Sequence, residues 1–179
     1  MKKYLFASLL YFISLHSQAQ VMKSNNQFIG FGKFTLGKPT AAFGDNITYA
    51  TKYTKDNHEF KLYNYLIIPG EPVEIMSIPF NSTVLTFDDN NKLVAFSFIK
   101  FYKKTDSWKF EKDARTDAEK LNDYLAGELN DKGENKMYDK TSKITEKGQE
   151  WNGAKGLLKV RQQHLSNHSV VEISFTANQ

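Results

Sequence analysis

The stretch TVLTFDDNNKLVAFSFIKFY, residues 83–102, decides how this chain folds. Two runs rich in β-branched and aromatic residues flank a polar cluster, Asp88 to Asn91, and this pattern is typical of a β-hairpin. The second run, from Leu93 to Phe101, carries apolar residues at both odd and even positions. We therefore expect a central strand that another apolar element covers on at least one face.

That cover is predicted directly downstream, as an amphipathic helix over about residues 113–132. Its apolar residues recur at helical spacing and form one stripe: Ala114, Ala118, Leu121, Leu125 and Leu129. Thr116 and Glu119 match a capping box near the start, and Asp113 is an alternative N-cap. Gly133 suits the position just after the helix end.

Further hairpins are predicted on both sides of this unit. Residues 47–54 and 59–68 alternate between two faces around a turn-rich gap, as expected of paired strands. Residues 156–164 and 170–177 form a similar pair near the end of the chain. Residues 73–82 are expected to be a linking loop or an edge segment.

The fold class follows from this order of elements. The polar stretch from residue 134 to residue 150 could hold one short strand, around 137–144. The expected fold is α+β: an antiparallel β-sheet built from hairpins, with one main amphipathic helix (about 113–132) packed on one face.

The first residues match an export signal. Two lysines precede an apolar run from Tyr4 to Leu15, and small residues suit cleavage after Ala19. The run is shorter than the roughly 20 residues that span a bilayer, so we expect no retained membrane span. The predicted organisation is a cleaved secretory signal peptide (1–19), a flexible arm (20–28) and a single α+β domain (29–179).

Charge and cysteine content narrow the class of protein. The chain has 24 basic and 20 acidic residues, and removal of the leader takes away two lysines and no acid. Because nucleic-acid binding needs a clustered basic footprint, and acids interrupt the lysines between Lys100 and Lys112, we expect no nucleic-acid partner. The chain has no cysteine, so a lipidated cysteine is excluded. We expect an exported protein, periplasmic or extracellular, that is not a lipoprotein.

No motif for catalysis, metal binding or cofactor binding is complete. Gly32 to Lys38 has the spacing of a phosphate-binding loop, but Pro39 stands where the magnesium-binding hydroxyl belongs. The H-E-x-x-H pattern of zinc enzymes and the G-x-S-x-G nucleophile elbow do not occur in the sequence. We therefore name no catalytic, cofactor-binding or metal-binding residue and expect no cofactor, although scattered residues could still assemble an enzyme site.

Aromatic residues provide the one candidate surface. The chain holds 9 Tyr and 2 Trp, and these side chains combine a large contact area with a polar group. We name Tyr63, Tyr65 and Trp108 as candidate partner-binding residues. The alternative is that such residues fill and rim the core between sheet and helix.

Two short stretches resemble a known group of envelope proteins. Leu36 to Pro39 with Phe43, and the Val84–Phe98 hairpin around Asp88–Lys92, are similar to beta-lactamase-inhibitor-protein-like domains and outer-membrane-assembly lipoproteins. The resemblance implies a small envelope domain that binds another protein. The chain departs from the group in its vestigial first helix and in having no lipidated cysteine or disulfide, so no site residue is carried over.

These observations together predict an exported bacterial envelope protein of non-enzymatic type that acts as a protein–protein interaction module. Its partner would be another envelope or secreted protein. The first alternative is a small-ligand binding protein, for glycan or lipid, with a cleft between sheet and helix. The second alternative is a hydrolase with an unmarked active site.

Overall fold

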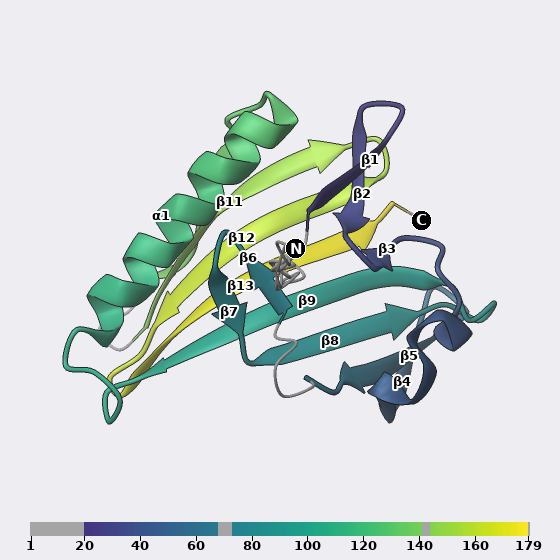
Figure 1. Ribbon diagram of the computed structural model, residues 1–179, viewed down its shortest axis with the longest axis horizontal. Helices are drawn as coiled ribbons and strands as arrows, with labels where there is room; N and C mark the ends of the chain where they lie inside the picture. The colour runs from purple at the N-terminus through teal and green to yellow at the C-terminus, as the bar shows by residue number, and fades with distance from the viewer. Residues whose placement is uncertain (1–19, 68–72, 141–143, 179) are drawn as a thin grey trace, which may run out of the picture.

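A computed structural model describes residues 20–67, 73–140 and 144–178. It confirms the α+β class, because an antiparallel sheet dominates the structure and one long helix packs against it (Figure 1). The predicted signal peptide, residues 1–19, lies outside the described residues.

Eight antiparallel strands form the main sheet. From one edge to the other they are β10 (Glu134–Lys140), β11 (Thr145–Gly153), β12 (Gly156–His164), β13 (His168–Ala177), β9 (Leu93–Lys103), β8 (Ser82–Phe87), β5 (His58–Tyr65) and β4 (Ile47–Lys55). The smaller elements are the sheet of β1 (Val21–Ser24), β2 (Gln27–Phe31) and β3 (Phe34–Thr35), the hairpin of β6 (Val73–Ile75) and β7 (Ile78–Phe80), the 3-10 helix η1 (Thr40–Asn46) and the α-helix α1 (Phe110–Leu129).

The predicted hairpins are confirmed as β4–β5, β8–β9 and β12–β13. Strand β9 lies inside the sheet between β8 and β13, as its apolar residues on both faces predict. The turn before β9 closes through a hydrogen bond that the Lys92 N–H donates to Asp88 Oδ1 at 2.8 Å. The polar cluster of the opening stretch therefore makes the turn that aligns the two strands.

One face of the sheet carries the hydrophobic core. Side chains at alternate positions of five strands point to this face: Tyr65, Leu85, Phe87, Phe96, Phe98, Leu158, Val160, Val171, Ile173 and Phe175. Full burial of one such side chain contributes about 1.5–3 kcal/mol to folding. Most of the stability of this cysteine-free chain must therefore come from this face.

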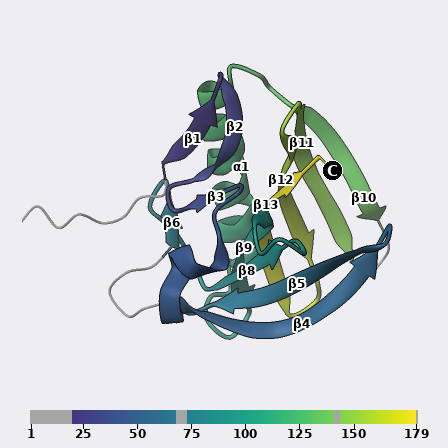
Figure 2. The same ribbon diagram turned by 90° about the vertical axis from the view of Figure 1, so that its right-hand side faces the viewer.

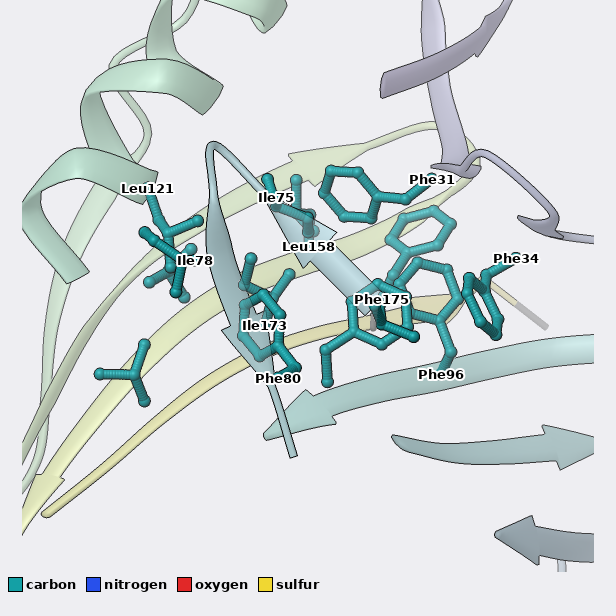
Figure 3. Close-up of a cluster of buried hydrophobic side chains, with 14 of the residues drawn as sticks. Phe31, Phe34, Ile75, Ile78, Phe80, Phe96, Leu121, Leu158, Ile173 and Phe175 are labelled. Atoms are coloured by element: carbon teal, nitrogen blue, oxygen red, sulfur yellow. The ribbon is translucent and has the colours of Figure 1, made fainter. Parts of the chain in front are cut away.

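Three elements cover the core face side by side (Figure 1): α1, the β6–β7 hairpin and the β1–β3 sheet. Figure 3 shows how each of them contributes, with Leu121 from α1, Ile78 from β7 and Phe31 from β2 gathered over the sheet residues Ile173 and Phe96. The opposite face of the sheet is mixed in polarity, with charged and hydroxyl-bearing side chains beside apolar ones such as Phe60 and Phe101. No helix or strand of the described residues packs on it (Figure 2).

The helix is displaced from its predicted range of 113–132. It begins at Phe110, which is buried in the core, and it ends at Leu129. Thr116 lies inside the helix, so the predicted capping box is wrong. Asn130 adopts a left-handed conformation with φ of 52°, and the N–H of Asp131 donates to the Ala126 carbonyl. An asparagine therefore ends the helix where Gly133 was expected, because asparagine tolerates this conformation better than most residues.

Three segments predicted to be irregular are strands. The expected flexible arm, 20–28, contributes β1 and the start of β2. The two strands are joined at Asn25 and Asn26 with φ of 51° and 61°, and this backbone conformation is typical of a tight hairpin turn. Residues 73–82, expected to be a linking loop or an edge segment, contain the hairpin of β6 and β7. The polar stretch 134–150 forms β10 and most of β11, so the single short strand predicted there is wrong.

The helix is also held to the sheet by a polar contact within the interface. Tyr102 and Lys100 of β9 both donate to Asp117 Oδ2 of α1, at 2.6 and 2.8 Å. Burial, and then the hydrogen bond to Asp117, raise the pKa of the Tyr102 hydroxyl. The phenol therefore stays protonated and serves as a donor across the ordinary pH range.

We expect Asp117→Ala to lower the free energy of unfolding by about 2–3 kcal/mol, because it leaves the Tyr102 hydroxyl and the Lys100 ammonium without their shared acceptor. Urea unfolding followed by circular dichroism would measure the change. Asp123→Ala, at an exposed carboxylate of the same helix, is the control and should change the free energy of unfolding by less than about 0.5 kcal/mol. Equal effects of the two variants would contradict this account.

Candidate functional site

The structure places the candidate residues Tyr63 and Tyr65 on the core face of the sheet. Tyr63 pairs with Leu85, whose side chain points to the core. Tyr65 is only 5% exposed, meets the ring of Phe34 edge-on at 5.1 Å, and accepts a hydrogen bond from Lys33 Nζ. The ring of Tyr65 is therefore part of the core and leaves little surface for a partner to contact.

Tyr63 is half-buried between two other rings. It meets Phe87 edge-on at 5.3 Å and Tyr49 at 5.6 Å. In β5, Tyr63 and Tyr65 lie on one face and Phe60 and Leu62 on the other, as the alternation predicts. The face that packs on the core is the one with the tyrosines. The sheet therefore does not offer the two tyrosines to a partner as one platform.

Trp108 lies elsewhere, in the segment that leads into α1, and its side chain is 83% exposed. The local sequence explains this placement. The Lys109 N–H donates to Ser107 Oγ at 3.0 Å, and Phe110 turns into the core to start the helix. Trp108 lies between these two contacts and its side chain remains in solvent. Lys109 Nζ lies 4.8 Å from the centre of the Trp108 ring.

Trp108 borders a groove of about 1000 Å³ between the start of α1 and the ends of β10, β11 and β12. In Figure 1 the start of the helix and the β12–β13 turn lie at the same corner of the molecule. Five exposed basic side chains line the groove against a single carboxylate, Glu111. They are Lys109, Lys112, Arg115, Lys140 and Lys147.

The sequence contained a signal for this cluster. Lys109, Lys112 and Arg115 recur every three residues, and this spacing places side chains on one side of a helix. The strand lysines Lys140 and Lys147 could not be added, because β10 and β11 were not predicted as a pair. The sequence, in which acids interrupt the lysines between Lys100 and Lys112, therefore did not reveal a concentrated positive surface.

His164 forms part of the groove wall. Its two ring nitrogens lie 2.7 Å from Gln162 Nε2 and 2.7 Å from Ser169 Oγ. Burial lowers the pKa of the imidazole, and the nearby charges of Lys147 and Arg115 act in the same direction. The two contacts link the histidine to Gln162 on its own strand and to Ser169 on β13, so it helps to hold β12 and β13 together.

A second hollow, of about 430 Å³, lies on the open face of the sheet. Its charged groups are paired with one another. Arg161 donates from Nε to Glu172 at 2.9 Å and from Nη1 to Glu146 at 2.8 Å. Lys159 Nζ stands 2.9 Å from Glu150.

Tyr138 borders the same hollow and donates to Glu150 Oε1 at 2.6 Å. This hydrogen bond, together with Lys159, lowers the pKa of Glu150. Glu150 therefore stays ionised and fixes both Tyr138 and Lys159 at the edge of the hollow.

Within the described residues, no three His, Asp or Glu side chains converge as a metal ion would require. No helix in that part of the chain is both long and apolar enough to cross a bilayer.

No protein-family model, curated protein or solved structure matches the chain. The function is therefore inferred from the geometry of the structure.

We expect His164 to make stability depend on pH. Its pKa is lower in the folded state than the value near 6.5 of an unfolded chain, so the unfolded state takes up the proton first. The stability contribution is complete above this pH and is lost as the pH falls from about 6.5 toward the folded-state pKa. Urea unfolding at a series of pH values would show this loss in the wild type.

The variant His164→Gln should lack that component, so the difference in unfolding free energy between wild type and variant should change with pH below about 6.5. His58→Gln, at an exposed histidine, controls for the removal of an imidazole from the surface. A constant difference between His164→Gln and wild type from pH 8 to pH 5 would be incompatible with the assignment.

Proposed function

We propose that this chain is an exported, non-enzymatic binding protein whose basic groove takes an acidic segment of another envelope or secreted protein. Export is supported by the leader pattern of residues 1–19. The single observation that carries the binding role is the 83% exposed Trp108 at the border of a groove with five basic side chains.

The chemistry of the groove favours a peptide segment over a small ion. Trp108 and Met137 are both strongly exposed and both line the groove, and exposed apolar side chains gathered within a polar rim mark interaction sites. Tryptophan is also among the residues most enriched at the energetic centres of protein interfaces. An acidic segment with an apolar residue would satisfy both the lysines and the indole ring.

The surrounding charge would act mainly on the rate of association. Clustered basic side chains attract an acidic partner from a distance and raise its association rate constant. The lysines themselves are exposed, so each contact with a carboxylate would contribute at most about 1 kcal/mol. The buried part of the interface, around Trp108, would then supply most of the affinity.

A capture experiment with a chemical cross-linker tests this proposal. The tagged full-length chain, purified after export, is incubated with envelope extract of its source organism. A carbodiimide then joins lysine amines directly to carboxylates. We expect cross-linked peptides in which Lys109, Lys112, Lys140 or Lys147 is joined to Asp or Glu of one recurring protein.

Affinity measurements with that protein give the quantitative test. Trp108→Ala should raise Kd roughly 30-fold, about 2 kcal/mol, as expected for an interface centre. Lys112→Glu combined with Arg115→Glu should weaken binding at least as much at low salt and less at high salt.

The matched control is Lys120→Glu combined with Lys132→Glu, which makes the same change in net charge at exposed positions that do not line the groove. This control should leave Kd within about twofold, because neither lysine lines the groove and salt screens the remaining charge effect. Equal losses in the two pairs, or cross-links confined to lysines outside the groove, would overturn the proposal.

A further inference from the structure

The open face of the main sheet is curved into a hollow by the approach of its two edges. Tyr53 of β4 and Tyr138 of β10 lie on opposite edge strands, yet both line the same space of about 430 Å³. Figure 2 shows the end of β10 close to the β4–β5 hairpin. This volume lies in the range of sites that hold small organic ligands.

The floor of this hollow is rich in small and hydroxyl-bearing side chains, together with Val84. Thr86, Ala95 and Ser97 come from β8 and β9, and Ser174 and Thr176 come from β13. Ser97 pairs with Ser174, and Ala95 pairs with Thr176, so the small residues lie next to one another across the two strands. Their size leaves the space open, and their hydroxyl groups can both donate and accept hydrogen bonds.

Charged side chains beside this floor already have partners of opposite charge within the chain. Arg161 lies between Glu172 and Glu146, Lys159 is paired with Glu150, and Ser97 donates to Glu172. A charged ligand would have to separate at least one of these pairs. A neutral ligand with several hydroxyl groups can instead add hydrogen bonds to the free edges of the guanidinium and the carboxylates.

The two tyrosines are held in place by the sheet. Tyr53 is 45% exposed and stacks on Phe60, with ring centres 5.2 Å apart. The Tyr138 ring lies against Gly148, where a Cβ atom would stand 3.2 Å from Tyr138 Cε2 and 2.4 Å from the Val160 carbonyl oxygen. The glycine therefore allows the tyrosine to lie over the sheet, and Glu150 fixes its hydroxyl group.

A β-bulge determines that Tyr53 belongs to this face. The register between β4 and β5 shifts between Tyr49 and Thr51. Tyr49 consequently pairs with Tyr63 of the core face, while Tyr53 pairs with Phe60 of the open face. Two exposed tyrosines of one strand thus lie on opposite sides of the sheet, and only Tyr53 lines the hollow.

We propose that this hollow binds a neutral saccharide of about two sugar units. A sugar ring has an apolar face of C–H groups that can lie on Tyr53 or Tyr138, and a rim of hydroxyl groups that can meet the floor and the Arg161 cluster. The polar floor disfavours a lipid chain, since burial of its hydroxyl groups under hydrocarbon would leave them without partners. This site shares no lining residue with the basic groove, so the inference is independent of the proposed function.

Saturation-transfer difference NMR with the full-length protein tests the proposal. The probes are maltose, cellobiose, chitobiose, xylobiose and mannobiose, with digalacturonate as a charged ligand of similar size. We expect saturation transfer to at least one neutral disaccharide, strongest at its ring C–H protons, and weaker transfer to digalacturonate. No transfer to any neutral disaccharide, or stronger binding of digalacturonate, would overturn the proposal.

Variants then locate the site. Tyr53→Ala and Tyr138→Ala should each weaken the binding of that disaccharide at least tenfold, whereas Tyr49→Ala should leave its Kd within twofold. Thermal unfolding of each variant confirms that it is folded. Loss of binding in Tyr49→Ala to the same extent, or unchanged binding in both Tyr53→Ala and Tyr138→Ala, would contradict the assignment. Trp108→Ala should leave saccharide binding unchanged, which separates this result from the test of the groove.

Discussion

One interaction holds the structure together: the phenylalanines of β9 pack against the elements that cover them. Phe96 and Phe98 lie two residues apart on one face of the strand, with ring centres 5.0 Å apart. Phe31 of β2 meets both rings, and Phe34 of β3 meets Phe98 edge-on at 5.0 Å. The N-terminal strands therefore reach the centre of the main sheet and stabilise it without any disulfide.

Because β9 lies within the sheet, the side chains of the strands on either side of it are divided between the same two faces. Antiparallel pairing carries the core face from Phe96 to Leu85 on one side and to Phe175 on the other. The remaining positions of these strands are mixed: Ser97, Ser174 and Glu172 are polar, whereas Ile99 and Phe101 are apolar. A sheet with one covered face and one open face results, and this is a common arrangement for antiparallel strands.

The two hollows differ in how they use charge. The groove at the start of α1 collects exposed basic side chains with few acids, which suits attraction of an acidic partner from solution. The hollow on the open face pairs nearly every charge within the chain, which suits the recognition of a neutral molecule through hydrogen bonds. One small domain can therefore carry two binding surfaces that do not compete for the same kind of ligand.

Local alternation and local turns were enough to predict five features from the sequence. They are the hairpins β4–β5, β8–β9 and β12–β13, the amphipathic helix and the α+β class. The sequence did not predict β11, whose residues are polar on both faces except for Trp151 and which forms a strand only because β10 and β12 pair with it. The sequence also did not predict that Lys140 and Lys147 lie near the start of α1. The tertiary structure also decided that Tyr63 and Tyr65 face the core: alternation separates a strand into two faces, but only its register with neighbouring strands determines which face is buried.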